Sequence, residues 1–457
     1  MNEGIRQASL VIGVTCLLCS FSWAQPATNP TTKNAEVYEF SPLEVFRPAS
    51  IKSGDEYWDL LAGSVSKARI VNVAFPLLLD ASSDKEARPL RFTLDSSTSV
   101  FGNVEAQRLK TTPQKRSFSI KGKLDENKGE FDLYVNEFLT REGDQITKQQ
   151  ILVGNFDLNN GWIYSVRYVG KGHHAVLGVR KSDLLYRDCA SDQIAKAPLP
   201  VQPFAARKTA TTTTATVRIA IVYTDEVLDV HGNLPASIET VADFCIIQTN
   251  RALNDSETLT EVELGHFGPA SGYDENDKDY PQILVELKDG VVDSDLPNRR
   301  RDNECDLVCL LVSKPCVLVS GIAYTLDKSN NTPGDFAPLA FSVVEHFAST
   351  LTLKYTFAHE IGHLFGCEDW CTATSGCSGA PNCHSCPDSH RLHPYVYGHQ
   401  LFTDGPCSVM AYGKRILHYS NPSVEIDGND TGVEHESDNA KVIRTERGLV
   451  KSLSDEL

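Results

Sequence analysis

Two histidines four residues apart constrain this chain more than any other feature of its sequence. His359 and His363 fall on one face of an α-helix, one turn apart, so their imidazoles can hold a single zinc ion. Glu360 stands beside the first histidine, where its carboxylate can take a proton from a zinc-bound water. Residues 351–358 continue a helical, largely apolar pattern into the motif, which predicts that the helix begins before it.

The residues after the second histidine supply a helix stop and a third ligand. Gly366 ends the helix, and a turn at this glycine can bring Asp369 back toward the metal. A carboxylate oxygen binds zinc at about 2.0–2.2 Å, and its negative charge should make a bound water slightly less acidic. The third ligand has other candidates in adjacent Glu368 and in histidines of the following loop, which are His384, His390, His393 and His399.

A second motif follows at residues 408–413, with the sequence Ser-Val-Met-Ala-Tyr-Gly. Apart from Met1, Met410 is the only methionine in the sequence. We interpret Met410 as an apolar floor beneath the metal, with a plain core position as the alternative, because methionine is a common filler of cores.

Together the two motifs resemble the metzincin clan of zinc peptidases, in particular its reprolysin-like members and the bacterial peptidyl-Asp metallopeptidases. The likeness covers roughly residues 215–450 and implies an α+β fold, a metzincin (zincin-like) catalytic domain with a twisted mixed sheet above the HExxH helix. It also implies that Tyr412 touches the zinc or stabilises the transition state, with an ordinary half-buried tyrosine as the alternative. Most metzincins have histidine where Asp369 stands, and a few bacterial members have aspartate. The expected elements are strands at 217–224, 262–266, 307–312 and 321–324 and a helix at 234–253.

The start of the chain has the pattern of a secretory signal. A short polar head is followed by an apolar run at residues 10–21 and by small residues that favour cleavage after Ala24. The run is shorter than the about 20 residues of a spanning helix, so an uncleaved anchor is the weaker interpretation. We therefore expect residues 1–24 to be a signal peptide. The mature protein should be secreted, extracellular or periplasmic, and free of the membrane.

Composition divides the rest of the 457 residues into three parts. Residues 25–190 carry short alternating stretches that predict a β-rich domain, and residues 191–216 form an Ala/Pro/Thr-rich linker. Residues 217–457 are the metzincin-like zinc protease domain. The β-rich part resembles the N-terminal segments of bacterial reprolysin-like precursors, which implies a pro-domain and a latent precursor. The alternative is a binding module retained in the mature enzyme.

Cysteine usage agrees with export. Two of the 13 cysteines lie in the signal, and ten in residues 215–457 can pair fully as disulfides. Those ten are Cys245, Cys305, Cys309, Cys316, Cys367, Cys371, Cys377, Cys383, Cys386 and Cys407. The loop from Cys367 to Cys386 can instead hold a second, structural zinc. Cys189 is left over, and we hypothesise that its thiolate fills the open zinc position as a cysteine switch; it can also pair or stay free.

Charge narrows the choice of partners. The sequence has 60 acidic and 43 basic residues, a net charge of −17, which disfavours nucleic acid and anionic membranes. The acidic loop at residues 274–277 can bind calcium or form a plain solvated turn. We expect a monomer.

These features predict a secreted, zinc-dependent endopeptidase that hydrolyses peptide bonds of proteins or peptides, with Glu360 as general base. Two alternatives remain open. One is a catalytically silent metzincin relative that acts as a protein-binding module. The other is a peptidase whose third ligand comes from a later helix, at Glu434 or Glu436.

The latency hypothesis has a direct test. Replacing Cys189 by serine removes the thiolate that would fill the open zinc position, so activity should appear early during maturation. The lag before activity, measured on a protein substrate, checks this expectation. An unchanged lag would count against the switch.

Overall fold

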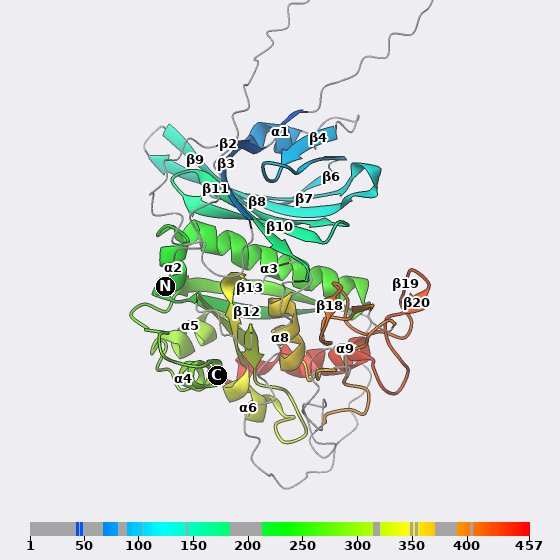
Figure 1. Ribbon diagram of the computed structural model, residues 1–457. Coiled ribbons are helices and arrows are strands. Elements are labelled where there is room, and N and C mark those ends of the chain that lie inside the picture. The colour runs from blue at the N-terminus through cyan, green and yellow to red at the C-terminus, as the bar shows by residue number, and fades with distance from the viewer. Residues whose placement is uncertain are drawn as a thin grey trace, which may run out of the picture. The chain divides into compact units, whose positions relative to one another are not determined.

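The computed structural model consists of two compact units, Met1–Lys181 and Ser182–Leu457 (Figure 1). The residues it describes are 43–44, 46–48, 67–80, 89–103, 105–142, 145–182, 213–313, 320–347, 351, 355–370, 391–402 and 405–457. The predicted signal peptide, the linker core and Cys189 lie outside these ranges.

The N-terminal unit is built around an eleven-stranded sheet, in the order β1-β4-β5-β7-β8-β9-β10-β11-β3-β2, with β6 paired to β7. Its pairings are antiparallel except that of β1 with β4. The β-rich fold predicted for this region is confirmed, whereas its role as a pro-domain stays a prediction. The strands are β1 Leu43–Glu44, β2 Phe46–Pro48, β3 Lys67–Val73, β4 Pro89–Thr93, β5 Ser99–Asn103, β6 Glu105–Thr111, β7 Lys115–Leu124, β8 Gly129–Glu142, β9 Gln145–Leu158, β10 Trp162–Gly170 and β11 His173–Arg180.

An aromatic cluster forms the centre of this unit's core. Phe92, Phe131 and Phe156 come from three strands, and their ring centroids lie 5.0–5.5 Å apart. Leu78 of the short helix α1 (Phe75–Asp80) joins the same cluster of buried side chains. Aromatic pairs at these separations stabilise a core beyond their buried area.

The C-terminal unit contains a five-stranded sheet in the order β13-β12-β14-β16-β15. Four strands are parallel, and the edge strand β15 is antiparallel, so the predicted mixed sheet is confirmed. The central strand β14 has six consecutive buried apolar residues, as expected of a strand covered on both faces. The strands are β12 Ala215–Tyr223, β13 Thr260–Pro269, β14 Leu307–Val312, β15 Gly321–Ala323 and β16 Phe341–Glu345.

Two helices place the site against this sheet. Helix α3 contacts β13, helix α8 contacts β15 and β16, and the two helices contact each other. The remaining elements either are short or follow α8 in sequence. The helices are α2 Asp225–Val230, α3 Pro235–Asp255, α4 Tyr280–Lys288, α5 Leu296–Asp302, α6 Pro333–Phe336, α8 Thr356–Leu364 and α9 Asn439–Val450, and the short strands are β17 Pro406–Cys407, β18 Lys414–Arg415, β19 Glu425–Ile426 and β20 Asn429–Asp430.

The motif helix begins later than the sequence pattern predicts. Helix α8 starts at Thr356, because Tyr355 before it has φ of 46°, in the left-handed region that a right-handed helix cannot include. The expected helical lead-in is therefore confirmed at residues 356–358 and wrong at Tyr355, and residues 352–354 lie outside the described residues. Among the described helices, none has the length and apolar character to cross a bilayer.

The described cysteines correct the disulfide prediction. Cys305, Cys309, Cys367 and Cys407 are buried free thiols. Full pairing of the ten cysteines is therefore wrong for these four, which fill apolar space as small side chains. Five of the ten lie outside the described residues.

A buried histidine should make the N-terminal unit sensitive to acid. His174 accepts a hydrogen bond from the Leu152 N–H at 3.0 Å, and burial, with neighbouring His173, lowers its pKa from 6.5 to about 3. The unfolded chain binds this proton more tightly, so stability should fall as pH drops below 6.5 and stop falling near 3. Between these two pH values the free energy of unfolding should change by at most about 1.4 kcal/mol per pH unit, the value for one proton. Thermal unfolding of the full chain between pH 7 and 4 measures this loss.

His174→Gln is the matched control for this prediction, because its side-chain oxygen can accept the Leu152 N–H without titrating. The variant should lose less stability between pH 7 and 4 than the wild type. Equal losses in both proteins would rule out His174 as the acid-sensitive group.

Candidate metal centre

The motif residues sit on a short helix that is buried along its whole length. All nine residues of α8 are buried, and apart from Thr356 its sequence is apolar except where it carries the motif. Gly366, at φ of 89°, reverses the chain, and its N–H and that of Cys367 bond the carbonyls of His363 and Gly362. The helix stop predicted at Gly366 is confirmed.

The turn brings three side chains together. His359, His363 and Asp369 offer ligand atoms that all lie within 4.8 Å of one another, the single such group among the described residues. The Nε2 atoms of the two histidines lie 3.1 and 3.5 Å from Oδ1 of Asp369. At most 1% of each side chain is exposed.

Backbone carbonyls fix the orientation of both imidazoles. The Nδ1–H of His359 donates to the Val409 carbonyl at 2.8 Å, and the Nδ1–H of His363 donates to the Cys367 carbonyl at 2.9 Å. Each Nε2 is then the ring nitrogen that faces Asp369, which is the orientation that a metal bound in place of a proton requires. Sequence could not point to these acceptors, because a backbone carbonyl belongs to every residue type.

The facing atoms lack other partners. Nε2 of both histidines and Oδ1 of Asp369 are buried and make no hydrogen bond. Burying three such acceptors face to face is costly unless a cation lies between them. Two imidazole nitrogens and a carboxylate oxygen are a donor set that zinc accepts, so the residues fit this metal.

The electrostatics of the side chains also favour a positive charge here. Burial alone would lower the pKa of His363, but the Asp369 carboxylate, helped by Glu360 and Glu368, raises it to about 9. Burial, helped by the Arg415 charge, lowers the pKa of His359 to about 4. Burial would raise the pKa of Asp369, yet both histidines hold it well below its usual value. The site therefore keeps an anionic carboxylate that attracts a cation.

Two backbone contacts hold Asp369 in place. On one side, the Glu368 N–H donates to the Val396 carbonyl at 2.8 Å. On the other side, the Trp370 N–H donates to the Met410 carbonyl at 3.0 Å. The backbone is thus fixed on both sides of Asp369, and on one side it is fixed by Met410.

Met410 packs directly against the motif helix. It is fully buried, and a Cβ added at Gly362 would lie only 2.3 Å from its sulfur. Gly362 lies between His359 and His363 in sequence. The methionine therefore contacts the helix within the segment that carries both histidines. The interpretation of Met410 as an apolar floor agrees with this contact.

Glu360 lies between its helix and the edge strand of the sheet. Only 1% of the residue is exposed, and a Cβ added at Gly321 of β15 would lie 2.4 Å from its Oε1. The glycine therefore leaves room for the carboxylate beside the strand. Tyr412 is also at the site, where its hydroxyl donates to Oδ2 of Asp369 at 2.6 Å.

Comparison with known proteins agrees with this geometry. Residues 213–399 match metallo-peptidase family M12. This part of the chain is similar to metzincin-like metallopeptidase domains.

Curated relatives of this chain are named metalloendopeptidases. Two peptidyl-Asp metalloendopeptidases of Stenotrophomonas maltophilia are similar: that of strain R551-3 is 25% identical over 50% of this chain and 51% of its own length, and that of strain K279a is 24% identical over 67% of each. A peptidyl-Asp metalloendopeptidase of Xanthomonas campestris pv. campestris is 23% identical over 67% of this chain and 66% of its own. The matches thus span about half to two thirds of these relatives.

Among solved structures, a chaperone–substrate complex matches with a TM-score of 0.39 and 16% identity, covering 52% of this chain and 36% of that one. A likeness of that size supports no conclusion.

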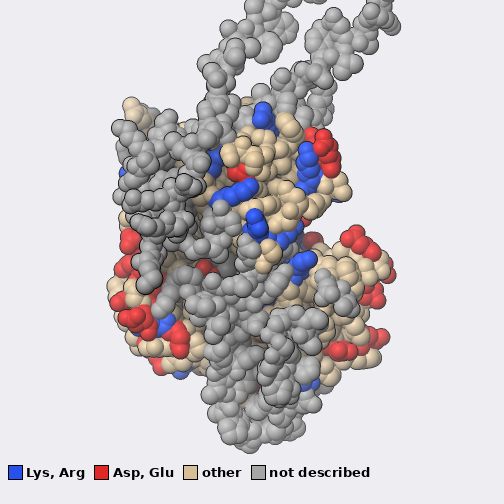
Figure 2. Space-filling view, in the orientation of Figure 1, with Lys and Arg blue, Asp and Glu red and all other residues tan. Residues whose placement is uncertain are grey.

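The rival ligands in the metallopeptidase domain lie elsewhere where they are described. His393 Nε2 pairs with Glu446 at 2.9 Å, and neither Glu368 nor His399 joins the metal group. His384 and His390 lie outside the described residues. The later-helix alternative is not supported, because Glu434 and Glu436 are exposed and precede α9 rather than lying on it. Glu425, Asp427 and Asp430 are exposed as well. Figure 2 shows that acidic side chains gather on the exposed surface.

The acidic loop considered for calcium uses its one buried carboxylate for protein contacts. Glu275 accepts hydrogen bonds from the Thr224 hydroxyl at 2.8 Å and from the Ser313 N–H at 2.9 Å. These bonds tie the loop to the ends of β12 and β14. The described residues give no support to calcium at this loop.

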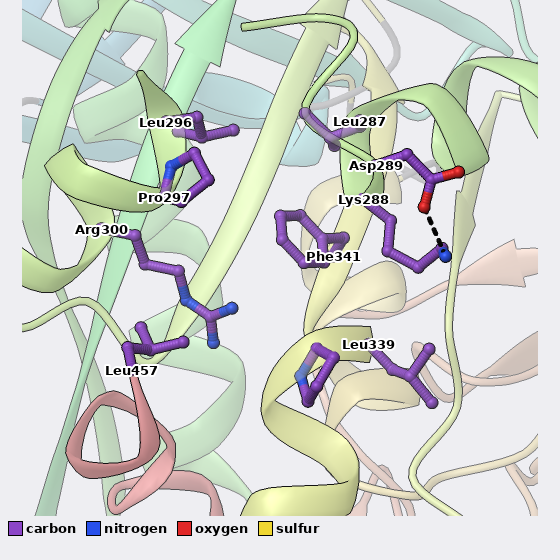
Figure 3. A pocket seen from close by; sticks show the side chains of 10 residues that line it. Leu287, Lys288, Asp289, Leu296, Pro297, Arg300, Leu339, Phe341 and Leu457 are labelled. Atoms are coloured by element: carbon purple, nitrogen blue, oxygen red, sulfur yellow. Dashed lines mark ion pairs between the residues drawn. The ribbon is translucent and has the colours of Figure 1, made fainter. Parts of the chain in front are cut away.

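A separate cavity of about 410 Å³ lies in the same unit, beside α4 and α5 (Figure 3). Phe341 lies at its centre, and the buried guanidinium of Arg300 donates three hydrogen bonds to backbone carbonyls beside it. Lys288 pairs with adjacent Asp289 at 2.6 Å. None of the residues around this cavity belongs to the metal group.

The contact of Gly362 with Met410 can be tested by Gly362→Ala. Alanine normally stabilises a helix relative to glycine, by up to about 1 kcal/mol. Here the new methyl group meets the Met410 sulfur at 2.3 Å, so the variant should instead lose about 1–3 kcal/mol. Denaturant unfolding checks the sign and the size of the change.

Gly448→Ala in α9 is the matched control, because nothing lies within 4 Å of its added Cβ. This variant should be as stable as the wild type or more stable. The packing argument fails if both alanine variants change stability in the same direction.

Proposed function

We propose that residues 217–457 act as a zinc-dependent endopeptidase, with His359, His363 and Asp369 as ligands and Glu360 as general base. The observation that carries this proposal is the meeting of three buried, hydrogen-bond-free ligand atoms on the motif helix and the turn after it. The match of this part of the chain to a metallo-peptidase family supports the same chemistry.

The side chains divide the work of peptide hydrolysis. When bound, zinc would act as a Lewis acid and lower the pKa of a water at its open position to about 7. Glu360 takes a proton from the attacking water and later delivers it to the leaving amine. Burial of Glu360 against Gly321 keeps bulk water away from the carboxylate during this transfer.

We propose proteins or peptides as substrates, with cleavage beside aspartate. The relatives are named peptidyl-Asp metalloendopeptidases, which motivates this preference. Paired peptides that differ by Asp against Asn at one position measure the preference.

We also propose that the enzyme is exported as a latent precursor. Cleavage after Ala24, the pro-domain role of residues 25–190 and the Cys189 switch are the parts of this proposal. The separation of the chain into two compact units agrees with an N-terminal part that can be removed as a whole.

A catalytically silent binding module is the less favoured alternative. Such a module has no need of a general base, yet Glu360 lies buried beside the metal group. The charge of its carboxylate is felt at His363, whose pKa it helps to raise. Retention of this group favours catalysis.

Replacing Glu360 by glutamine separates metal binding from catalysis. The variant should keep one zinc per chain but lose about 10²–10⁴-fold in kcat/KM, because the amide cannot accept the proton. Zinc content by mass spectrometry and hydrolysis of a generic protein substrate are measured together. Glu434→Gln, at an exposed glutamate outside the metal group, is the control and should keep most activity.

His359→Ala should lose both zinc and activity, and chelation of the wild type should reproduce that loss. Full activity of the Glu360→Gln variant, or of the chelated wild type, would exclude the proposed chemistry.

A further inference from the structure

The two oxygens of Asp369 have different partners. Oδ1 faces the histidine nitrogens at 3.1 and 3.5 Å, whereas Oδ2 accepts a hydrogen bond from the Tyr412 hydroxyl at 2.6 Å. Both residues are buried, with 1% of Asp369 and 6% of Tyr412 exposed. One oxygen is therefore directed to the metal group, and the other is held by a phenol.

We propose that Tyr412 is a positioning residue that makes Asp369 a one-oxygen metal ligand. This inference rests on the proposed function, because it assumes that Asp369 binds the metal. It gives Tyr412 a role different from the transition-state contact that the family resemblance implies. The tyrosine acts through Asp369, because its hydroxyl donates a hydrogen bond to the ligand and not to the substrate.

The hydrogen bond restricts how the Asp369 carboxylate can bind a metal. A carboxylate can bind a metal through one oxygen or through both, while a histidine in the same place has one nitrogen available. Holding Oδ2 by a short charge-assisted bond leaves Oδ1 alone for the metal. The bond also withdraws charge from the anionic ligand, which offsets its weakening effect on the metal as a Lewis acid.

The backbone fixes the distance between the two partners. The Tyr412 N–H donates to the Trp370 carbonyl at 3.0 Å, and the Trp370 N–H donates to the Met410 carbonyl at 3.0 Å. These paired bonds tie the residue after Asp369 to the segment that carries the tyrosine. Arg415 Nε adds a bond to the Ala411 carbonyl at 3.0 Å, on the same segment. The phenol is thus held in register with the carboxylate.

Tyr412→Phe in the full chain tests the proposal, since it removes the hydroxyl and keeps the ring. Zinc affinity is measured by competition with a chromophoric chelator, and cobalt is used as a spectroscopic probe. The zinc Kd should rise about 10–100-fold, as is typical when a partner of a metal ligand is lost. The visible cobalt band should weaken, because Asp369 can then bind through both oxygens and raise the coordination number.

Tyr419→Phe is the matched control. Its hydroxyl is also buried and donates a bond of 2.6 Å, but to the Ala358 carbonyl on the motif helix. This variant should lose stability while its zinc Kd stays within about threefold of the wild type, since it has no bond to a ligand. Equal zinc affinities for the Tyr412→Phe variant and the wild type would overturn the proposal. A lower kcat with unchanged zinc affinity would instead assign Tyr412 to the transition state.

An Asp369→His background provides a second test. Histidine has no second ligand oxygen to restrain, so adding Tyr412→Phe there should leave zinc affinity unchanged. An effect as large as in the natural background would overturn the proposal.

The cobalt spectrum of the wild type is a test that needs no variant. An intense band of four-coordinate cobalt is expected, and a weak band of higher coordination would contradict the proposal. A wild type that binds no zinc would refute the proposed function itself.

Discussion

The candidate site depends on two hydrogen bonds from imidazoles to backbone carbonyls. Val409 and Cys367 accept these bonds, and thereby turn the free nitrogens of His359 and His363 toward Asp369. Without them, either ring could rotate or change its tautomer, and the helical spacing of the histidines would not define a site. Neither carbonyl belongs to the motif helix. Cys367 follows the turn at Gly366, and Val409 directly precedes Met410.

Small residues and close packing support these bonds. Gly362 leaves space for Met410, Gly321 leaves space for Glu360, and Gly366 takes the positive φ that reverses the chain. Each glycine stands where a side chain would collide with a group of the site or would strain the backbone. Three positions without side chains thus make room for the groups of the site, and its polar side chains are buried.

Local spacing made much of this predictable from the sequence. The four-residue interval of the histidines, the stop at Gly366 and the individual strands follow from helical geometry, glycine chemistry and apolar patterning. The mixed sheet was expected from the family resemblance alone. The sequence could not place the start of α8, because the left-handed conformation of Tyr355 has no signal in residue type. Among the described cysteines the sequence also overestimated disulfides, since buried thiols and paired cysteines look alike in a sequence. The Tyr412–Asp369 bond joins residues 43 positions apart, a contact that local patterns do not encode.

X-ray absorption at the zinc edge of the purified, matured protein tests the central claim most directly. The account predicts one zinc per chain, with two nitrogen neighbours at about 2.0–2.1 Å and oxygen neighbours at about 2.0–2.2 Å. Replacing Asp369 by alanine should remove one oxygen neighbour and weaken binding. Sulfur neighbours at about 2.3 Å in the matured protein, or no bound metal, would contradict it.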